Sequence, residues 1–119
     1  MKTIVLKFGG TSVGSIERIK KVTKIISSFK KRRYNVAVIS SAMSGVTNDL
    51  VKKSEMISDN FDKAEYDVLV STGEIASCAL IAARLKHIGF ISRSWQSWQI
   101  PIITSGSHSN SRIQTANIR

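Results

Sequence analysis

The segment TIVLKFGGTSVGS, residues 3–15, decides the fold of this 119-residue chain. It opens with a short apolar run from Thr3 to Phe8, which is typical of a buried strand. Gly9 and Gly10 end the run, because glycine permits a tight turn and a close approach of the backbone. Ser15 follows as the expected N-cap of a helix, since its hydroxyl can accept a free amide hydrogen bond in the first turn.

The residues after Ser15 predict a helix and then a second strand. Apolar residues recur at helical spacing and form one stripe with lysines opposite; they are Ile16, Ile19, Val22, Ile25, Ile26 and Phe29. Val36 to Ser40 is another continuous apolar run. Strand, helix and strand within about 40 residues make a βαβ unit, whose strands should be parallel and joined by a right-handed crossover.

Two more helices and two more short strands are expected downstream. We predict helices over 47–57 and 74–87, strands over 90–93 and 100–104, and a polar loop over 58–63. Gly89 is placed to end the later helix. The fold class is therefore α/β, with three layers and a mainly parallel sheet, and residues 1–119 belong to one domain. The tail, 105–119, is polar and predicts no definite structure.

Composition narrows the class of protein. The uninterrupted apolar runs are shorter than the roughly 18 residues needed to cross a bilayer. The N-terminus leads directly into a strand, unlike a signal peptide. Cys78 is the one cysteine, which excludes an internal disulfide framework and a cysteine zinc cluster. We expect a cytoplasmic protein with no membrane partner and no metal ligands of its own.

The net charge of +10 requires an explanation. Seven of the 18 basic residues fall between Lys20 and Arg33. A basic stripe can bind nucleic acid or an acidic membrane. A solvated helix face followed by a charged turn accounts for it more simply, because no nucleic-acid motif accompanies it. We do not expect a nucleic-acid partner, although a basic binding module remains the alternative function.

The glycine turn has the ingredients of a phosphate site. A helix N-terminus presents free N–H groups and a partial positive charge. Lys7 stands at the end of a strand, where parallel sheets bind ligands, and an ammonium about 4 Å from a phosphate charge gains roughly 4 kcal/mol at an effective dielectric near 20. Ser15 stands where a Walker A motif needs lysine, so that motif is excluded. On these residues alone, phosphate binding and a tight turn with an incidental lysine remain equally open.

Several separated segments resemble the aspartate kinase family, within the amino acid kinase (carbamate kinase-like) fold. They are KFGGTSV at 7–13, SAMSGVTN at 41–48, STGE at 71–74, WQIPIIT at 98–104 and SRI at 111–113. They follow the order of the family and cover essentially the whole chain. The resemblance implies the N-terminal half of that fold, truncated, without a regulatory ACT domain.

The resemblance also implies an activity. The family transfers the γ-phosphoryl group of ATP to the side-chain carboxylate of L-aspartate, giving 4-phospho-L-aspartate, the first step toward lysine, threonine and methionine. ATP is therefore the expected cofactor, with Mg²⁺ expected alongside the nucleotide. By resemblance, Lys7 neutralises charge on the transferring phosphoryl group, while the backbone at Gly9 and Gly10 and the hydroxyl of Ser12 cradle phosphate oxygens.

Three further residues match the family's positions for aspartate. Ser41 and Thr47 match residues that hold the substrate, and Glu74 matches the acid that receives its α-ammonium. Each has a simpler interpretation. Glu74 could merely favour a helix N-terminus, Thr47 could be only an N-cap, and Ser41 could be an ordinary hydroxyl at a strand end.

The chain also departs from the family. The family often has an acidic residue at the position of Ser105 and glycine at that of Ser109. Its kinase domain continues for at least as many residues again, with a glycine-arginine-glycine-glycine-serine-aspartate segment and most of the adenine pocket. We expect an incomplete or split form without unaided turnover, completed by a separately encoded C-terminal half, with oligomers in full-length members. Another amino acid kinase is the remaining alternative.

Overall fold

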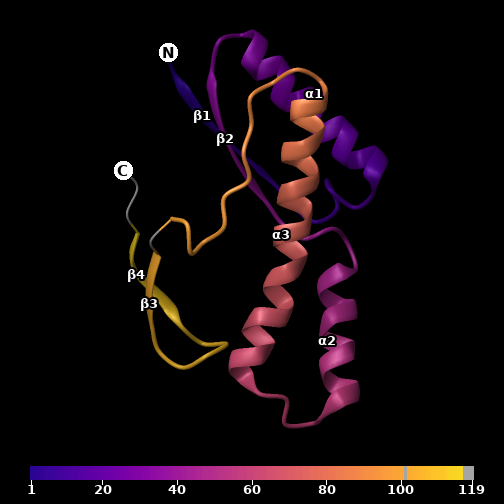
Figure 1. The fold of residues 1–119 in the computed structure, drawn as a ribbon, viewed down its shortest axis with the longest axis vertical. Coiled ribbons are helices and arrows are strands. Elements are labelled where there is room, and N and C mark those ends of the chain that lie inside the picture. The colour runs from indigo at the N-terminus through magenta and orange to yellow at the C-terminus, as the bar shows by residue number, and fades with distance from the viewer. Residues whose placement is uncertain (101, 117–119) are drawn as a thin grey trace.

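The computed structural model describes residues 1–100 and 102–116 (Figure 1). The elements follow in the order β1 (Thr3–Phe8), α1 (Ile16–Lys31), β2 (Asn35–Ser40), α2 (Val46–Ile57), α3 (Lys63–His87), β3 (Ile102–Ser105) and β4 (Arg112–Ala116). The long helix α3 lies beside α2 along its N-terminal half and beside α1 along its C-terminal half. The predicted α/β class is confirmed.

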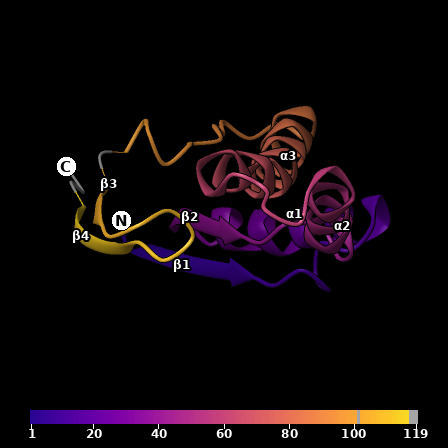
Figure 2. The same ribbon diagram turned by 90° about the horizontal axis from the view of Figure 1, so that it is seen from below.

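The predicted βαβ unit is present. β1 pairs in parallel with β2, in a register that runs from Thr3 opposite Asn35 to Phe8 opposite Ser40. Side chains alternate across the two strands, so Leu6 and Val38 turn toward the helices. The helices lie on one side of this pair (Figure 2).

The core lies between that face of the sheet and two helices. Its buried side chains come from the glycine turn, α1 and α3: Val13, Ile19, Val22, Ile26, Ile81 and Leu85. Burying one such side chain contributes about 1.5–3 kcal/mol to folding. The opposite face of the sheet is exposed, with Val5 at 64% and Ile39 at 53% of their full accessibility.

Local hydrogen bonds explain where α1 begins and ends. The predicted N-cap, Ser15, accepts a hydrogen bond from the Arg18 N–H at 3.2 Å. At the other end, the Arg33 N–H donates to Lys30 O at 2.9 Å and the Tyr34 N–H to Phe29 O at 3.1 Å. This pair of bonds is a Schellman motif, which places Arg33 in the left-handed region at φ 67°.

The beginning of α3 differs from the prediction. The helix starts at Lys63 rather than Glu74, because Asp62 caps it by accepting the Glu65 N–H at 2.9 Å. The hydroxyls of Ser71 and Thr72 donate to carbonyls one turn back, each at 2.7 Å, so the helix continues through them. The interpretation of Glu74 as a residue that favours a helix start is therefore wrong. The predicted end is confirmed, with Gly89 at φ 101°.

The composition of α3 also corrects the sequence-based view of membrane spans. Within the described part of the chain, one helix, α3, is long enough and apolar enough to cross a membrane, judged by length and composition only. Its apolar stretch is not uninterrupted, because charged residues such as Glu74 divide it. Core helices have the same composition, and α3 buries Gly73, Ser77, Ile81 and Leu85 within the protein.

The C-terminal part forms a separate antiparallel hairpin. The predicted strand at 90–93 is not formed; the Ser92 hydroxyl instead donates to Ala82 O of α3 at 2.6 Å. The strand predicted at 100–104 is found as β3, and Pro101 within it lies outside the described residues. β3 pairs with β4, which begins in the tail for which no structure was predicted. Residues 117–119 of that tail also lie outside the described residues.

A carboxylate on α3 holds the turn of this hairpin. Asp67 accepts hydrogen bonds from the Ser109 N–H at 3.0 Å and the Ser109 hydroxyl at 3.1 Å, and it lies 3.0 Å from His108 Nδ1. Chiefly because of the Ser109 N–H, and against an opposing effect of desolvation, the pKa of Asp67 is lowered from its ordinary value. Ser109, where the family often has glycine, adopts φ 67° in this turn.

Candidate functional site

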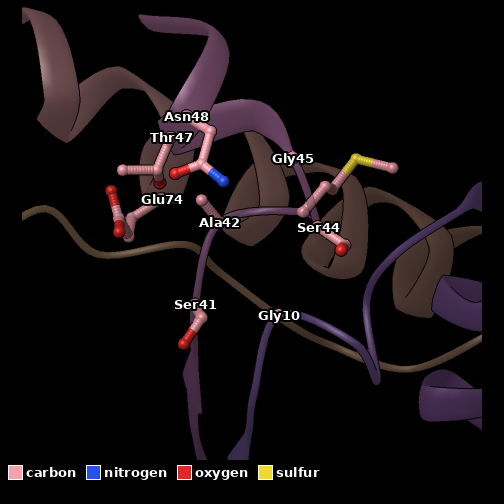
Figure 3. Close-up of a pocket in the computed structure, with 9 residues that line it drawn as sticks. Gly10, Ser41, Ala42, Ser44, Gly45, Thr47, Asn48 and Glu74 are labelled. Carbon is pink, nitrogen blue, oxygen red and sulfur yellow. The ribbon is translucent and has the colours of Figure 1, made fainter. Parts of the chain in front are cut away.

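A cavity of about 290 Å³ lies where β2 leaves the sheet (Figure 3). Three segments that are distant in the sequence line it: Gly10 from the glycine turn, residues between Ser41 and Asn48 from the loop after β2 and the start of α2, and Glu74 from α3. Figure 3 shows Thr47, Asn48 and Glu74 gathered on one side, with Ser41 and Gly10 across from them. The cavity thus brings hydroxyl, amide and carboxylate groups together.

The loop after β2 is held from both sides through its backbone. The Ser41 N–H donates to Phe8 O of β1 at 3.0 Å. On the other side, Ser41 O accepts the hydroxyl proton of Ser77 on α3 at 2.7 Å. The wall of the cavity is therefore bonded to the sheet and to the long helix at the same time.

Glycines allow the neighbouring segments to approach this loop closely. A Cβ added at Gly10 would lie 3.2 Å from Ala42 O, and one added at Gly73 would lie 3.0 Å from Ala42 Cβ. Contacts of 3.0–3.4 Å are tighter than nine in ten Cβ contacts in real proteins, so both sites are closely packed. Gly10 and Gly73 thereby clamp the loop between the glycine turn and α3.

α2 begins at the cavity without a side-chain cap. Its N-cap is Gly45 in the left-handed region at φ 85°, and no side chain bonds the first-turn N–H groups there. The interpretation of Thr47 as only an N-cap is therefore wrong. The first turn of a helix carries partial positive charge, so the α2 end of the cavity is suited to an anionic group.

The residues predicted to bind phosphate are only partly brought into this cavity. Gly10 lines it, whereas Lys7, Gly9 and Ser12 are exposed and are not among its lining residues. Lys7 lies opposite Ile39 near the carboxyl end of β1. The Ser12 N–H donates to Gly9 O at 3.1 Å, which forms the tight turn. Gly9 and Ser12 thus lie in the turn that follows β1, and Lys7 lies two residues before that turn on the exposed face of the strand.

The structure adds residues that the sequence analysis did not assign. Asn48 lines the cavity beside Thr47. Its position at the end of the SAMSGVTN segment is the sequence feature that could have indicated a role in the site. Ser77 is fully buried and bonds the Ser41 carbonyl. Nothing local in the sequence distinguishes Ser77 from other helical serines, because its partner is 36 residues away.

Cys78 lies one turn beyond Glu74 and is half-buried. Burial raises the pKa of its thiol, and the negative charge of Glu74 raises the pKa further. The thiol is therefore kept protonated, and a neutral thiol is a poor nucleophile. A catalytic role for Cys78 is not indicated.

A second cavity has a volume of about 490 Å³. It is bounded by β2, by Ile81 and Leu85 of α3, and by the segment 90–95. Its lining is mainly apolar and includes Arg93, whose guanidinium lies 4.0 Å from the ring centre of Trp95. None of the residues that we predicted to bind substrate or phosphate is among the residues that line it.

Comparison with protein families gives a match over nearly the whole chain. The family described as "Amino acid kinase family" matches residues 2–119. An aspartokinase of Rickettsia bellii (strain RML369-C) is 40% identical over 120 residues, which cover 98% of this chain and 30% of that protein. An aspartokinase of Geobacillus stearothermophilus is 44% identical over 113 residues, covering 95% of this chain and 28% of its own length. The chain thus spans about 30% of the length of these relatives.

Solved structures give the same result for the fold. The aspartate kinase from Synechocystis superposes with a TM-score of 0.72 and 42% identity, covering 73% of this chain and 15% of that chain. E. coli aspartokinase III in complex with aspartate and ADP superposes with a TM-score of 0.57 over 72% of this chain and 30% of that chain. At 23% identity, the second likeness concerns the fold alone.

Proposed function

Because the chain belongs to the amino acid kinase family, we propose that it forms the aspartate-binding part of an aspartate kinase. The reaction would be ATP-dependent phosphorylation of the side-chain carboxylate of L-aspartate. The observation that carries the proposal is the cavity in which Ser41, Thr47 and Glu74 meet. Identity of 40–44% with aspartokinases supports the choice of aspartate over the substrates of other amino acid kinases.

The cavity matches the functional groups of an amino acid. The Glu74 carboxylate would pair with the α-ammonium, an attraction that strengthens away from bulk water. The Thr47 hydroxyl and the first turn of α2 would receive a carboxylate. With about 290 Å³, the cavity lies at the small end of ligand sites, which suits a small substrate.

The exposed turn at the end of β1 would receive the phosphates of ATP. A Cβ at Gly9 would meet nothing within 4 Å, so the backbone there is open to a ligand. Lys7 would neutralise the transferring phosphoryl group, while Gly9, Gly10 and Ser12 would hold its oxygens. In the part of the chain that the structure describes, no group of three or more His, Cys, Asp and Glu could hold a metal ion. Mg²⁺ would enter with the nucleotide, whose phosphates commonly bind it.

The proposed enzyme requires a second polypeptide segment. The chain spans about 30% of its relatives, and the exposed face with Val5 and Ile39 presents apolar surface to solvent. We propose that the C-terminal part of the kinase domain, which this chain does not contain, covers this face and supplies the remaining nucleotide contacts. In the family setting, the assembled enzyme would be a cytoplasmic oligomer that serves lysine and threonine synthesis.

The substrate site can be tested with Glu74→Gln. This change removes the charge that would pair with the α-ammonium, so L-aspartate should bind roughly tenfold more weakly, or about 1.4 kcal/mol. Isothermal titration of the 119-residue chain measures the affinity. Glu55→Gln, at an exposed position on α2 outside the cavity, is the matched control and should bind normally. Equal affinities for the two variants would remove Glu74 from the site.

The phosphoryl role is tested after the second half is added. An aspartyl hydroxamate assay should show ATP-dependent product only when both parts are present, and Lys7→Ala should abolish it. The alternative of a basic binding module predicts tight, salt-sensitive binding of RNA or DNA without aspartate chemistry. The exposed lysines of α1 lie opposite its buried stripe, as expected for a solvated face, so we favour the kinase.

A further inference from the structure

Ser77 is buried at the junction of the cavity's two walls. It lies on α3 one turn after Glu74, and none of its surface is exposed. Its side chain does not line the cavity. We propose that Ser77 is a positioning residue, which holds the Ser41 wall at a set distance from Glu74; this inference rests on the proposed aspartate site.

The hydrogen bonds of Ser77 cross from the helix to the loop. Its Oγ lies 2.7 Å from Ser41 O and 3.1 Å from Glu74 O. A hydroxyl has one proton to donate, and the shorter distance assigns that proton to Ser41 O. The Ser40 hydroxyl, at 3.0 Å, donates to the same carbonyl and lies 3.5 Å from Ser77 Oγ.

Other helical hydroxyls of this chain do not make such a bridge. Thr23, Ser54 and Ser71 each donate to a carbonyl three residues back in their own helix, at 2.6–2.7 Å. Ser77 has such a carbonyl in reach but bonds a loop 36 residues away at a shorter distance. The local bond is therefore secondary, and the contact between α3 and the loop is the distinctive one.

The surrounding packing makes this bond decisive for the cavity's shape. Ser41 is fixed to β1 through its N–H and to α3 through its carbonyl. One turn before Ser77, Gly73 packs closely against Ala42. Without the Ser77 hydroxyl, the loop would keep its apolar contact with α3 but lose the polar bond that sets its orientation. A site that binds both ends of a small substrate depends on such support.

Ser77→Ala tests the proposal, with Ser54→Ala as the matched control. Ser54 is also a buried helical serine, at 3% exposure, but its hydroxyl bonds only Val51 O of its own helix. L-aspartate should bind Ser77→Ala about tenfold more weakly than the wild type and Ser54→Ala with unchanged affinity. Ser77→Cys retains a weak donor and should recover part of the affinity; it also serves if the alanine variant does not fold. Wild-type affinity in Ser77→Ala, or equal losses in the two alanine variants, would overturn the positioning role.

A second measurement separates this inference from the proposed function. Amide hydrogen exchange over residues 41–48 needs no substrate and should accelerate in Ser77→Ala but not in Ser54→Ala. If the wild-type chain fails to bind L-aspartate, the proposed substrate site falls, and this exchange experiment still decides whether Ser77 orders the loop. Unchanged exchange in Ser77→Ala would overturn the inference even where aspartate binds.

Discussion

Glu74 shows how a residue's surroundings determine its chemistry. At a helix start its charge would stabilise the helix dipole. In the middle of α3 it gains little from that dipole and instead lies beside Thr47 and Asn48 on one side of the cavity. Helix stability therefore does not account for this position, and under the proposed function the substitution at Glu74 should affect binding first.

Arg33 carries local strain that can be relieved. It adopts φ 67° at the end of α1, a conformation that glycine reaches without a steric penalty. Arg33→Gly should raise the free energy of unfolding by about 1 kcal/mol. Urea denaturation measures the change. Arg33→Lys keeps the strain and should leave the midpoint unaltered; a lower midpoint for the glycine variant would show that the arginine side chain contributes more than its backbone costs.

Among the helices and strands, the elements formed by neighbouring residues are those that sequence patterns predict correctly. The β1–α1–β2 unit follows from an apolar run, a glycine turn and a capped helix, each formed by residues close in sequence. The predicted helix over 74–87 leaves out the first part of α3, which begins at Lys63 and includes Gly73, a residue type of low helix propensity. The structure shows Gly73 inside the helix, where its missing Cβ admits Ala42. The need for glycine here comes from packing against a residue about 30 positions away. A short window of sequence around Gly73 therefore does not reveal it.

The residues of the candidate site also fall into those that sequence motifs predict and those that depend on contacts between distant segments. Motifs located Ser41, Thr47 and Glu74, and the structure brings them to one cavity. Motifs could not locate Ser77, because its role depends on a hydrogen bond between distant segments. The strand predicted at 90–93 is absent for a related reason. The Ser92 hydroxyl bonds a carbonyl of α3, and the residues around Ser92 give no sign of this distant partner.

The contact between α3 and the hairpin should respond to pH. The folded state lowers the pKa of Asp67 below that of the unfolded chain. Its contribution is therefore fully present above the unfolded pKa and is lost as the pH falls through the folded pKa. The amide signal of Ser109, followed by NMR from neutral to strongly acidic pH, should move in that acidic range. Asp67→Asn should show the detached signal already at neutral pH; if the signal is unaffected by the substitution, other contacts hold the hairpin.

The whole molecule is more extended than a compact domain of its length. Its radius of gyration is 16.1 Å, compared with about 13.5 Å expected for 119 residues in a compact domain. Its shortest extent is 18 Å, which agrees with helices on one side of the β1–β2 pair (Figure 2). The exposed apolar face and these dimensions together support a chain that works with additional polypeptide.

The exposed face should make the isolated chain self-associate. Val5→Lys places a charge in the middle of that face and should shift the chain toward monomer in sedimentation velocity. Met56→Lys adds the same charge on α2, where the side chain is 86% exposed, and should have no such effect. Association that persists in Val5→Lys would assign it to another surface. The same variant should also weaken binding of the C-terminal half.

The pairing of β1 with β2 has a consequence for the order in which the protein is made. Both strands and their connecting helix are complete at Ser40, before any residue of α2 or α3 has been synthesised. A chain that leaves the ribosome from its N-terminus can thus close this unit first. The glycine turn and the backbone group that anchors Ser41 would then already be in place when Glu74 emerges. The nascent chain would complete the cavity against a unit that has already folded.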